Sequence, residues 1–558
     1  MSGASGAILV LTAAAVIGAH NSGVFVLSQG TVDVAAAIAT VVAAVAATIL
    51  FVMAVLASMY NGIIKDNGFD VNKYVNEPNP PFFSRFKVVF LHYVINVGRR
   101  KASKVPLPLE ERASPHMPGL RVTSRQGTKV KDGATPLTAE RLSKDALVVG
   151  TIRMGFGHHR IAYAASSWGV ASGRTTYFHD LLNIDSPEAT LIREMDKGYS
   201  QMSRLATEMG GVVEQIWGSL TRGADENMLR ASYQFGEHLL PLLLSIPKDT
   251  PIIATHCFVG LIAVALGFTK VINLVIDNHA QWFIVVPGAY NLVQGPSNYH
   301  NLLRMGVPPE RLILAGHWIP KDLVDNIESD CAVRIARARK RAPRRLLIPV
   351  GGAGAQRTFV SSFIKGLKGH VEEGSVQLFL NAGDHAHMKV AFEEALAEMG
   401  IAEGAFGRVS TMQGVRDFAD ALRSGKEPPH AVTLFAFGGA GVESDMAYFP
   451  AVATTDVLSR VTDVLACKPS ELAFYPVPKL MIRRVGDHEA FSALRASELG
   501  DGTLELREVP DAMAYIKKMD EGPDLLVTMN ECIIKNKAAG IYDGCKRAVE
   551  LAKQLAAQ

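Results

Sequence analysis

The chain has 558 residues, which is too many for one hydrophobic core and indicates at least two domains with an additional segment. Its net charge is only +3, and from residue 147 onward 42 basic residues are balanced by 45 acidic ones, so that part of the chain does not resemble a nucleic-acid-binding protein. The five cysteines are scattered and contain no CxxC pair, so we expect reduced thiols and neither a disulfide framework nor a metal site of the zinc type.

The first sixty residues are strongly apolar. Asp33 is their only charged residue, and the 27 residues from 34 to 60 carry no charge. As a helix this run would be about 40 Å long, which exceeds the roughly 30 Å of hydrocarbon in a bilayer. We therefore predict a transmembrane anchor of one or two helices within residues 1–61. The weaker apolar segment 6–27 fits a first span, a re-entrant piece or an interfacial helix, and no positive n-region precedes it that would indicate a cleaved signal peptide.

Residues 62–146 are predicted to form a basic juxtamembrane helix and a linker. Between residues 61 and 146 the chain has 15 basic and 8 acidic residues, a bias that marks the cytoplasmic side of a span and predicts the larger C-terminal part on the cytoplasmic face. Segment 80–101 combines aromatic residues with a basic end, which fits either a helix in the lipid headgroup layer or an amphipathic helix packed on the protein. Residues 102–144, rich in Pro, Gly, Ser and charge, predict a linker with little core.

Strand and helix patterns alternate through residues 147–322, which we predict to be a first α/β domain. Such alternation is typical of βαβ units and of a parallel sheet covered on both faces. The expected strands are 146–150, 175–179, 251–256, 270–277, 290–294 and 311–320, with helices at 187–210 and 224–245.

A glycine turn follows the first of these strands and opens a helix, with the sequence Gly155-Phe-Gly157-His158-His159. Glycines allow a ligand to approach the backbone closely, and the residues after the second glycine stand at a helix N-terminus. An imidazole with a pKa of about 6.5 can accept a proton there near neutral pH. The alternative is that the histidines only cap the helix. Two further polar residues at strand ends, Asp180 and His256, are interpreted as structural.

Residues 323–530 repeat the pattern and predict a second α/β domain. Strands are expected at 345–350, 376–380 and 431–435, and the glycine turns 351–356 and 438–443 each open a helix. Two Rossmann-like halves of this kind, with their glycine turns at the carboxyl ends of strands, would face each other across one cleft. The final segment, 531–558, predicts one long helix.

On these residues the chain resembles the GT-B glycosyltransferases of family 28, which include monogalactosyldiacylglycerol synthase, diacylglycerol glucosyltransferases and the lipid II GlcNAc transferase. The turn 155–160 is similar to the family's GGGH turn, although Phe156 stands in the place of a glycine. Segment 277–283 looks like the strand end with aspartate, histidine and tryptophan in the diacylglycerol enzymes. Segments 289–316, 351–356, 438–443 and 486–489 resemble further family motifs in the family's order, across roughly residues 147–555, and 351–356 departs from the usual form.

The resemblance implies a GT-B fold, with the C-terminal helix returning to the first domain, and transfer of a hexose from a nucleotide sugar to a lipid hydroxyl. The donor is typically a UDP-hexose, the reaction inverts the anomeric centre, and no cofactor or essential metal is implied. The implied partners are the nucleotide sugar, a lipid acceptor and the membrane. His158 would be the general base, with His159 as its close competitor, because one sequence does not fix which imidazole faces the substrate.

The other implied site residues form two groups. The acceptor side would comprise Gly155, Gly157, Asp277, His279 and Trp282. The donor side would comprise Gly351, Gly352, Gly354, Gln356, Gly438, Gly439, Gly441, Glu443, Asp487, His488 and Glu489. Glu443 is suited to accept hydrogen bonds from both ribose hydroxyls, because a carboxylate binds two donors. In each case the alternative is a helix-capping or local structural role.

Two rival functions stay open at this point. One is a catalytically silent GT-B-like protein that serves as a membrane-anchored subunit, and the departures in the glycine turns motivate it. The other is a sugar-nucleotide epimerase, which shares the GT-B shape but has no need of a bilayer.

Overall fold

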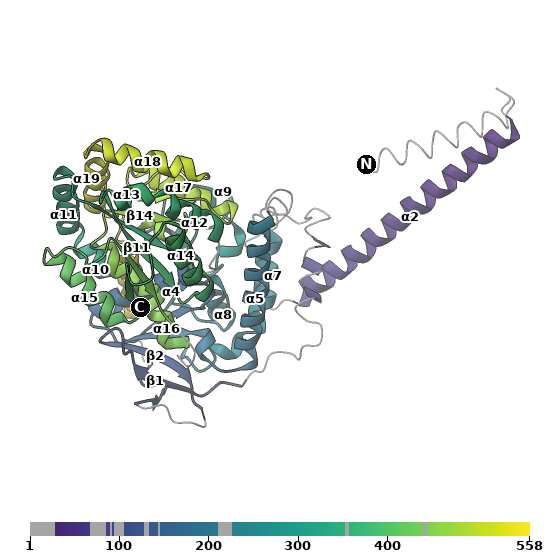
Figure 1. The fold of residues 1–558 in the computed structure, drawn as a ribbon. Helices are drawn as coiled ribbons and strands as arrows, with labels where there is room; N and C mark the ends of the chain where they lie inside the picture. The colour runs from purple at the N-terminus through teal and green to yellow at the C-terminus, as the bar shows by residue number, and fades with distance from the viewer. Residues whose placement is uncertain are drawn as a thin grey trace. The chain divides into compact units, whose positions relative to one another are not determined.

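The computed structural model describes residues 28–66, 85–86, 88–89, 92–93, 105–127, 133–142, 145–209, 226–351, 356–438 and 444–558. The chain divides into two compact units, residues 1–100 and 101–558 (Figure 1). The first contains the predicted anchor, and the second is a mixed α/β unit built on two sheets.

The first unit is dominated by helix α2 (Gln29–Asp66). Its section Val32–Ile63 is, by length and composition, the one helix among the described residues that is suited to cross a membrane. A helix over residues 34–60 agrees with the sequence prediction, and the weaker apolar segment 6–27 lies outside the described residues.

A small apolar cluster lies near the end of α2, where Tyr60 and Ile63 pack against Val88 and Val89. The latter two belong to the segment 80–101 for which the sequence predicts an aromatic, basic helix. Its described residues, 85–86, 88–89 and 92–93, are helical, and the side chain of Phe86 is exposed. Most of its other aromatic and basic residues lie outside the described residues.

The first sheet of the second unit has nine strands in the order β3-β1-β2-β5-β4-β6-β7-β8-β9. Strand β1 is antiparallel to β2 and β3, and every other pairing is parallel. The strands are β1 (Leu109–Ala113), β2 (Leu120–Arg125), β3 (Thr135–Pro136), β4 (Leu147–Thr151), β5 (Thr176–Asp180), β6 (Ile252–Ala254), β7 (Val271–Leu274), β8 (Tyr290–Val293) and β9 (Leu312–Leu314). Strands β4 to β9 fall within the predicted ranges to within one residue at their ends, because short apolar β-branched runs are buried on both faces of a parallel sheet.

Helices connect these parallel strands, as the alternating pattern predicts. They are α4 (Phe156–Ala171), α5 (Pro187–Met209), α7 (Glu226–Glu237), α8 (Cys257–Ala265) and α9 (Pro296–Arg304). The predicted helix 224–245 ends earlier than expected, because Gly236 lies in the last turn of α7 and Pro241 lies in a separate short 3-10 turn, η3 (Leu240–Leu242).

The predicted linker 102–144 differs from the structure, which places β1, β2 and β3 there as an extension of the first sheet. The composition is misleading because the polar residues of these strands satisfy one another. Glu111 is buried and forms ion pairs with Arg121 and Arg141. Ser124 donates a 2.9 Å hydrogen bond to the buried carboxylate of Glu110. Paired charges of this kind can be buried in a strand that the residue composition alone would assign to solvent.

The second sheet has six parallel strands in the order β12-β13-β11-β10-β14-β15. They are β10 (Arg344–Pro349), β11 (Val376–Gly383), β12 (Gly407–Val409), β13 (Val432–Ala436), β14 (Val464–Cys467) and β15 (Lys479–Met481). Alternate residues of β10 face two different cores: Leu346 and Ile348 pack in one cluster, and Leu347 in the other. Helices therefore cover both faces of this sheet (Figure 1).

The helices of this half lie between and after the strands. They are α10 (Lys321–Asp325), α11 (Ile327–Arg339), α12 (Arg357–Gly366), α13 (Lys368–Glu372), α14 (Ala386–Glu398), α15 (Met412–Arg423), α16 (Ser444–Ser459), α17 (Ala490–Glu498), α18 (Val509–Glu521), α19 (Asp524–Ala538) and α20 (Gly544–Ala557). Strands β12, β14 and β15, of three or four residues each, were not predicted from the sequence.

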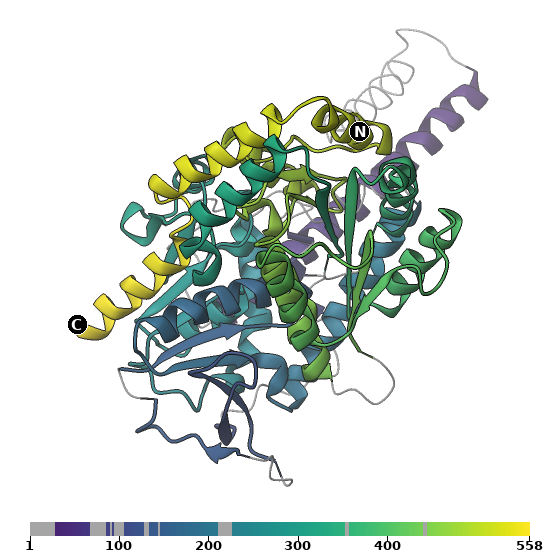
Figure 2. The same cartoon turned by 60° about the vertical axis from the view of Figure 1, so that its left-hand side comes forward.

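The end of the chain forms two helices where the sequence predicts one. Helix α19 stops near Gly540, whose φ of +71° is the left-handed conformation that commonly ends helices. Helix α20 then packs against the first sheet and α4, with Cys545, Ala548 and Val549 in the same core as Leu147 (Figure 2). The chain passes close to Gly316 on its way, since a Cβ there would lie 2.5 Å from the Ile541 carbonyl oxygen.

Candidate functional site

The glycine turn after β4 has the conformation that its sequence predicts. Gly155 has a φ of +74° and is the N-cap of α4, which begins at Phe156. A residue with a Cβ is strained at that φ, so the turn requires glycine at this position. The turn therefore brings His158 and His159 into the first turn of a helix at the carboxyl edge of the first sheet.

His158 has a defined tautomer. Its Nδ1 atom lies 2.6 Å from the carbonyl oxygen of Thr255, and the hydroxyl of Thr255 donates back to the carbonyl of His158 at 3.1 Å. A carbonyl oxygen only accepts, so Nδ1 must carry the proton of this hydrogen bond. In the neutral ring, Nε2 is then the nitrogen with a free lone pair, which is the atom that a general base uses.

Burial and neighbouring charges set the pKa of His158. Burial lowers the pKa of His158 below its ordinary value, and the Thr255 carbonyl and the charges of Asp277 and Glu471 partly offset that effect. The ring of His256 lies 4.3 Å away, centroid to centroid, and is itself held by its Nδ1 accepting from the Phe258 amide at 3.2 Å. His158 is accordingly neutral near pH 7, with two carboxylates near enough to stabilise the protonated form when it appears.

His159 lies in a different environment. It is 3% exposed, its ring makes an edge contact with Phe178, and its Nε2 lies 3.5 Å from Asp180. Burial, together with Arg153 and His158, lowers the pKa of His159 well below its ordinary value. Asp180 accepts from the amide of Leu182 at 3.0 Å and so caps a short 3-10 turn, which is the structural role expected of it.

The glycine turn also contacts the second half of the unit. Glu471, which follows β14, lies against Gly157: a Cβ at 157 would be 3.2 Å from its Oε2. Phe156 is 2% exposed, and its ring atoms would lie 3.0 Å from a Cβ at Gly383, which ends β11. Both partners stand at carboxyl ends of strands in the second sheet. The carboxyl edges of the two sheets therefore meet at this turn, where ligands bind in open α/β sheets.

A buried charge cluster fixes this contact. Arg160 donates to Asp456 at 2.7 Å and to the Val452 carbonyl at 2.8 Å, and its Nε lies 3.8 Å from Glu471. The hydroxyl of Tyr475 donates to the same Asp456 oxygen at 2.7 Å. Burial alone would lower the pKa of Arg160, but these neighbours raise it, so the guanidinium stays charged. One arginine of α4 thus interacts with two carboxylates from the second half of the unit.

The residues expected on the acceptor side are only partly brought together. Asp277 follows β7 and accepts from Gln281 at 3.2 Å. The ring of His279 stacks on Phe491 of α17 at 4.5 Å between centroids. Trp282 is 3% exposed and lies in the interior, where its side chain is part of the core. Asp277 and His279 are thus near the meeting edges, and Trp282 contributes through packing.

On the donor side, two of the expected residues, Gly351 and Glu489, contact Lys468, just after β14. Its chain covers Gly351, where a Cβ would be 2.7 Å from Lys468 Cε, and its ammonium pairs with Glu489. Burial would raise the pKa of Glu489, but Lys468 and His488 together with the Val485 amide lower it, so this carboxylate is charged. Gln356, at a left-handed φ of +73°, donates to the Arg483 carbonyl.

Much of the expected donor site lies outside the described residues. This applies to Gly352, Gly354, Gly439, Gly441 and Glu443, while Gly438 is described, with a φ of +87° just after β13. Asp487 is part of the 3-10 turn η7 (Asp487–Glu489). Within the described part of the chain, no cluster of three or more His, Cys, Asp or Glu side chains is arranged to hold a metal ion.

Sequence reasoning missed Glu471 and Lys468. Both follow β14, a strand of four residues that was not predicted from the sequence. Had β14 been recognised, the polar residues after its carboxyl end would have been candidates on the same grounds as those after β10 and β13.

Fold and site together define a class: a mixed α/β protein with two sheets of mainly parallel strands, whose carboxyl edges meet at a glycine turn that carries a neutral histidine. Two family models match, both described as domains of unknown function: DUF6937 over residues 118–303 and DUF6938 over residues 307–553. No curated protein matches the sequence.

Several solved structures of sugar-nucleotide proteins are similar at low identity. A UDP-GlcNAc 2-epimerase from Neisseria meningitidis has 12% identity and a TM-score of 0.41, over 73% of this chain and 99% of that one. One from Methanocaldococcus jannaschii has 12% identity and a TM-score of 0.34, over 71% and 99%. An O-GlcNAc transferase from Thermobaculum terrenum has 11% identity and a TM-score of 0.29, over 76% and 70%. TM-scores in this range do not establish a common fold.

Proposed function

We propose that this protein is a membrane-anchored inverting glycosyltransferase with a GT-B arrangement of two Rossmann-like domains. It would move a hexose from a nucleotide sugar, typically UDP-hexose, to the hydroxyl of a lipid. The observation that carries the proposal is the state of His158: a neutral imidazole with Nδ1 bonded to Thr255, its Nε2 lone pair available, at the turn where the two sheets meet.

In the proposed reaction, Nε2 of His158 removes the proton of the acceptor hydroxyl while that oxygen forms a bond to the anomeric carbon. The bond from that carbon to the diphosphate oxygen breaks, and the electron pair leaves with the diphosphate. The imidazolium formed in this step is stabilised by the negative charges of Glu471 and Asp277, which favour the protonated ring. His159 is a poorer candidate, because its imidazole is buried against Asp180.

The departing diphosphate needs positive charge. Helix N-termini supply part of it, and the turn 438–443, which precedes α16, would supply that of α16. Lys468, whose aliphatic chain lies beside Gly351 and whose ammonium pairs with Glu489, is a second cation on this side. These groups would stabilise the leaving group without a metal ion.

The predicted membrane anchor is consistent with a lipid acceptor. Helix α2 is suited to span a bilayer, and tethering an enzyme to the surface that holds its acceptor raises the local acceptor concentration without any new contact in the site. The basic bias of residues 61–146 supports an orientation with the α/β unit on the cytoplasmic face.

The test is transfer by the full chain in lipid nanodiscs that contain a total membrane lipid extract. Radiolabelled UDP-hexoses are supplied one at a time, and label in the lipid phase is measured. A transferase produces labelled glycolipid. An epimerase converts the sugar nucleotide without labelling lipid, and a silent subunit leaves the nucleotide sugar intact, so these two results contradict the proposal.

One observation favours the catalytically silent subunit as a second candidate. Phe156, in the place of a family glycine, is buried and packs against Gly383, where its ring occupies space between the two sheet edges. A silent subunit of this kind would fail to bind UDP in a titration, whereas the transferase binds it even without an acceptor.

A further inference from the structure

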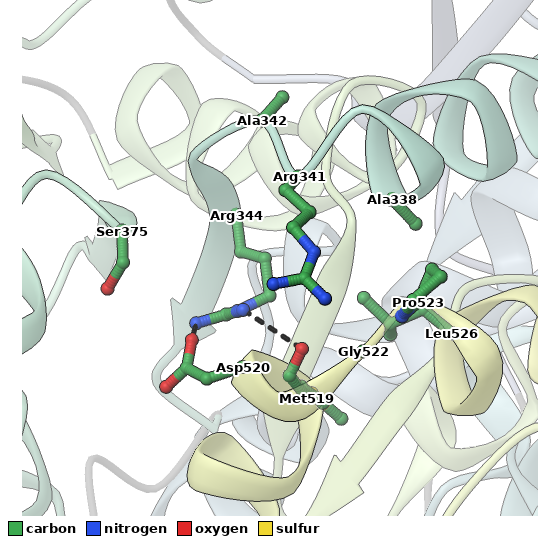
Figure 3. Close-up of a pocket in the computed structure, with 10 residues that line it drawn as sticks. All are labelled: Ala338, Arg341, Ala342, Arg344, Ser375, Met519, Asp520, Gly522, Pro523 and Leu526. Atoms are coloured by element: carbon green, nitrogen blue, oxygen red, sulfur yellow. Dashed lines mark hydrogen bonds and ion pairs between the residues drawn. The ribbon is translucent and has the colours of Figure 1, made fainter.

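A pocket of about 160 Å³ lies far from the glycine turn, at the opposite edge of the second sheet (Figure 3). Arg344, the first residue of β10, and Ser375, just before β11, line it together with the connection between α18 and α19. All strands of this sheet are parallel, so this is the amino edge, whereas Gly351 and Gly383 stand at the carboxyl edge. The pocket is therefore separate from the candidate catalytic site.

Arg341 occupies a backbone position that normally favours glycine. Helix α11 ends in two backbone hydrogen bonds, from Arg341 to Ala338 at 3.0 Å and from Ala342 to Arg337 at 3.1 Å, and Arg341 itself has a φ of +51°. This is the left-handed position after a helix C-terminus, which glycine adopts without steric cost. An arginine is uncommon at such a position, and we infer that its side chain has a role that offsets the backbone strain.

Most hydrogen-bond donors of the Arg341 guanidinium have no protein acceptor among the described residues. Among the described residues it makes one hydrogen bond, from Nη2 to the Glu521 carbonyl at 3.4 Å, out of the five N–H donors that a guanidinium offers. In Figure 3 the guanidinium lies between Arg344 and the α18–α19 connection, beside the pocket. A ligand with several acceptor oxygens would satisfy the remaining donors.

Arg344 offers a second donor. Its Nη1 donates to the Met519 carbonyl at 3.2 Å, and its Nη2 pairs with Asp520, as the dashed lines in Figure 3 mark. Its Nε is buried and has no hydrogen-bond partner in the described part of the chain. A buried donor on a charged group is costly to leave unsatisfied, so the fold leaves this guanidinium incompletely paired.

The surroundings are basic. Residues 334–345 contain seven Lys or Arg and no acidic residue. Several of these are used within the fold, for example Arg337, which pairs with Asp463 at 3.2 Å. Arg339 and Lys340 are exposed and form no ion pair among the described residues, so the α11 side of the pocket adds positive charge to that of Arg341 and Arg344.

We propose that this pocket binds a phosphate group, either free or in the headgroup of an anionic lipid. Its two arginines and one aspartate leave a net positive charge that suits an anion, and guanidinium groups match the geometry of phosphate oxygens. The volume of about 160 Å³ is roughly ten times that needed to hold one water, which leaves room for a tetrahedral anion. This site is independent of the proposed transferase activity.

The variant Arg341→Gly tests the proposal without the risk of unfolding the protein, because glycine is the residue that this φ favours. The full chain in phosphatidylcholine nanodiscs is titrated with inorganic phosphate against chloride at constant ionic strength, and Tm and Kd are measured. Phosphate should raise Tm of the wild type, since a ligand that binds only the native state stabilises it. Arg341→Gly should weaken binding about tenfold to a hundredfold, the effect of losing a hydrogen bond to a charged group.

Arg339→Gln is the matched control, because it removes a neighbouring exposed charge that does not line the pocket. It should keep the phosphate-dependent shift. Repeating the comparison in nanodiscs that contain phosphatidylglycerol distinguishes the two sources of phosphate. If only these discs raise the Tm of the wild type above that of Arg341→Gly, the ligand is the lipid headgroup. If soluble phosphate does so, the ligand is a free phosphate compound. If neither phosphate nor phosphatidylglycerol stabilises the wild type more than Arg341→Gly, the proposal is overturned.

Discussion

The carboxylate of Glu471 lies against Gly157, one residue before His158, with its Oε2 positioned 3.2 Å from where a Cβ at 157 would be. Its charge raises the pKa of His158 against the larger lowering effect of burial. Glu471→Gln should therefore lower the pKa of His158 further. A base acts in its neutral form, so the acid limb of the kcat/KM profile should move to lower pH.

The same shift can be followed without activity, by NMR titration of a protein labelled at its histidine side chains. Glu403→Gln, which neutralises an exposed carboxylate paired with Arg408, is the control and should leave the His158 titration in place. An unchanged His158 titration in Glu471→Gln would show that the two groups are not electrostatically coupled.

The ion pair between Arg160 and Asp456 should be important for stability. Asp456→Ala leaves the 2% exposed guanidinium of Arg160 without its closest carboxylate, and breaking a buried pair in this way typically costs about 3–5 kcal/mol. Urea unfolding measures the loss. The control is Asp322→Ala. The Asp322 carboxylate is 72% exposed beside Arg460, so its removal should lower the free energy of unfolding by about 1 kcal/mol or less. Equal losses in the two variants would argue against a buried, interlocking pair.

Acid should destabilise the protein through its buried neutral histidines. Burial lowers the pKa of His179 to about 4, against about 6.5 for an exposed imidazole, so between these values the unfolded state binds the proton and the native state does not. The stability that the neutral His179 ring contributes is fully present above about pH 6.5 and is lost as pH falls toward 4. The free energy of unfolding should change by on the order of 3 kcal/mol.

Unfolding free energies measured at several pH values between 7 and 4 check this sign. His159 and His256 should add to the same slope, because burial also lowers their pKa values. His179→Gln should reduce the slope whatever its effect on overall stability. A free energy of unfolding that is constant across this range would contradict the assignment of neutral buried rings.

The crossing of the final segment over Gly316 predicts a severe effect of Gly316→Ala. The added Cβ would lie 2.5 Å from the backbone oxygen of Ile541, and the φ of +97° adds strain, so we expect a loss of about 2–3 kcal/mol or more. Gly374→Ala is the control, since its φ is also positive, +71°, but nothing lies within 4 Å of the new Cβ. Thermal unfolding compares the two, and similar Tm values would mean that the close crossing is not maintained.

The sheets were largely predictable, and the site only in part. Apolar β-branched runs such as 147–149 are buried on both faces of a parallel sheet, and this local pattern is enough to locate them. The choice between His158 and His159 depends on Thr255, 97 residues away, which no local pattern encodes. Strands β1 and β2 were missed because the buried carboxylates of Glu110 and Glu111 are satisfied by residues elsewhere in the chain, Glu110 by a hydrogen bond from Ser124 and Glu111 by an ion pair with Arg121. Glu471 was missed because the strand before it, β14, was not predicted.

The most direct test of the proposed chemistry is the rate of hexose transfer by His158→Gln in lipid nanodiscs, with Tm measured on the same preparation. His158 is half-buried and makes one side-chain hydrogen bond among the described residues, to Thr255, so the variant should fold. The account predicts that turnover falls by about 10²-fold or more, the usual effect of removing a positioned base, while Tm changes little. Transfer at the wild-type rate by a folded His158→Gln protein would contradict it.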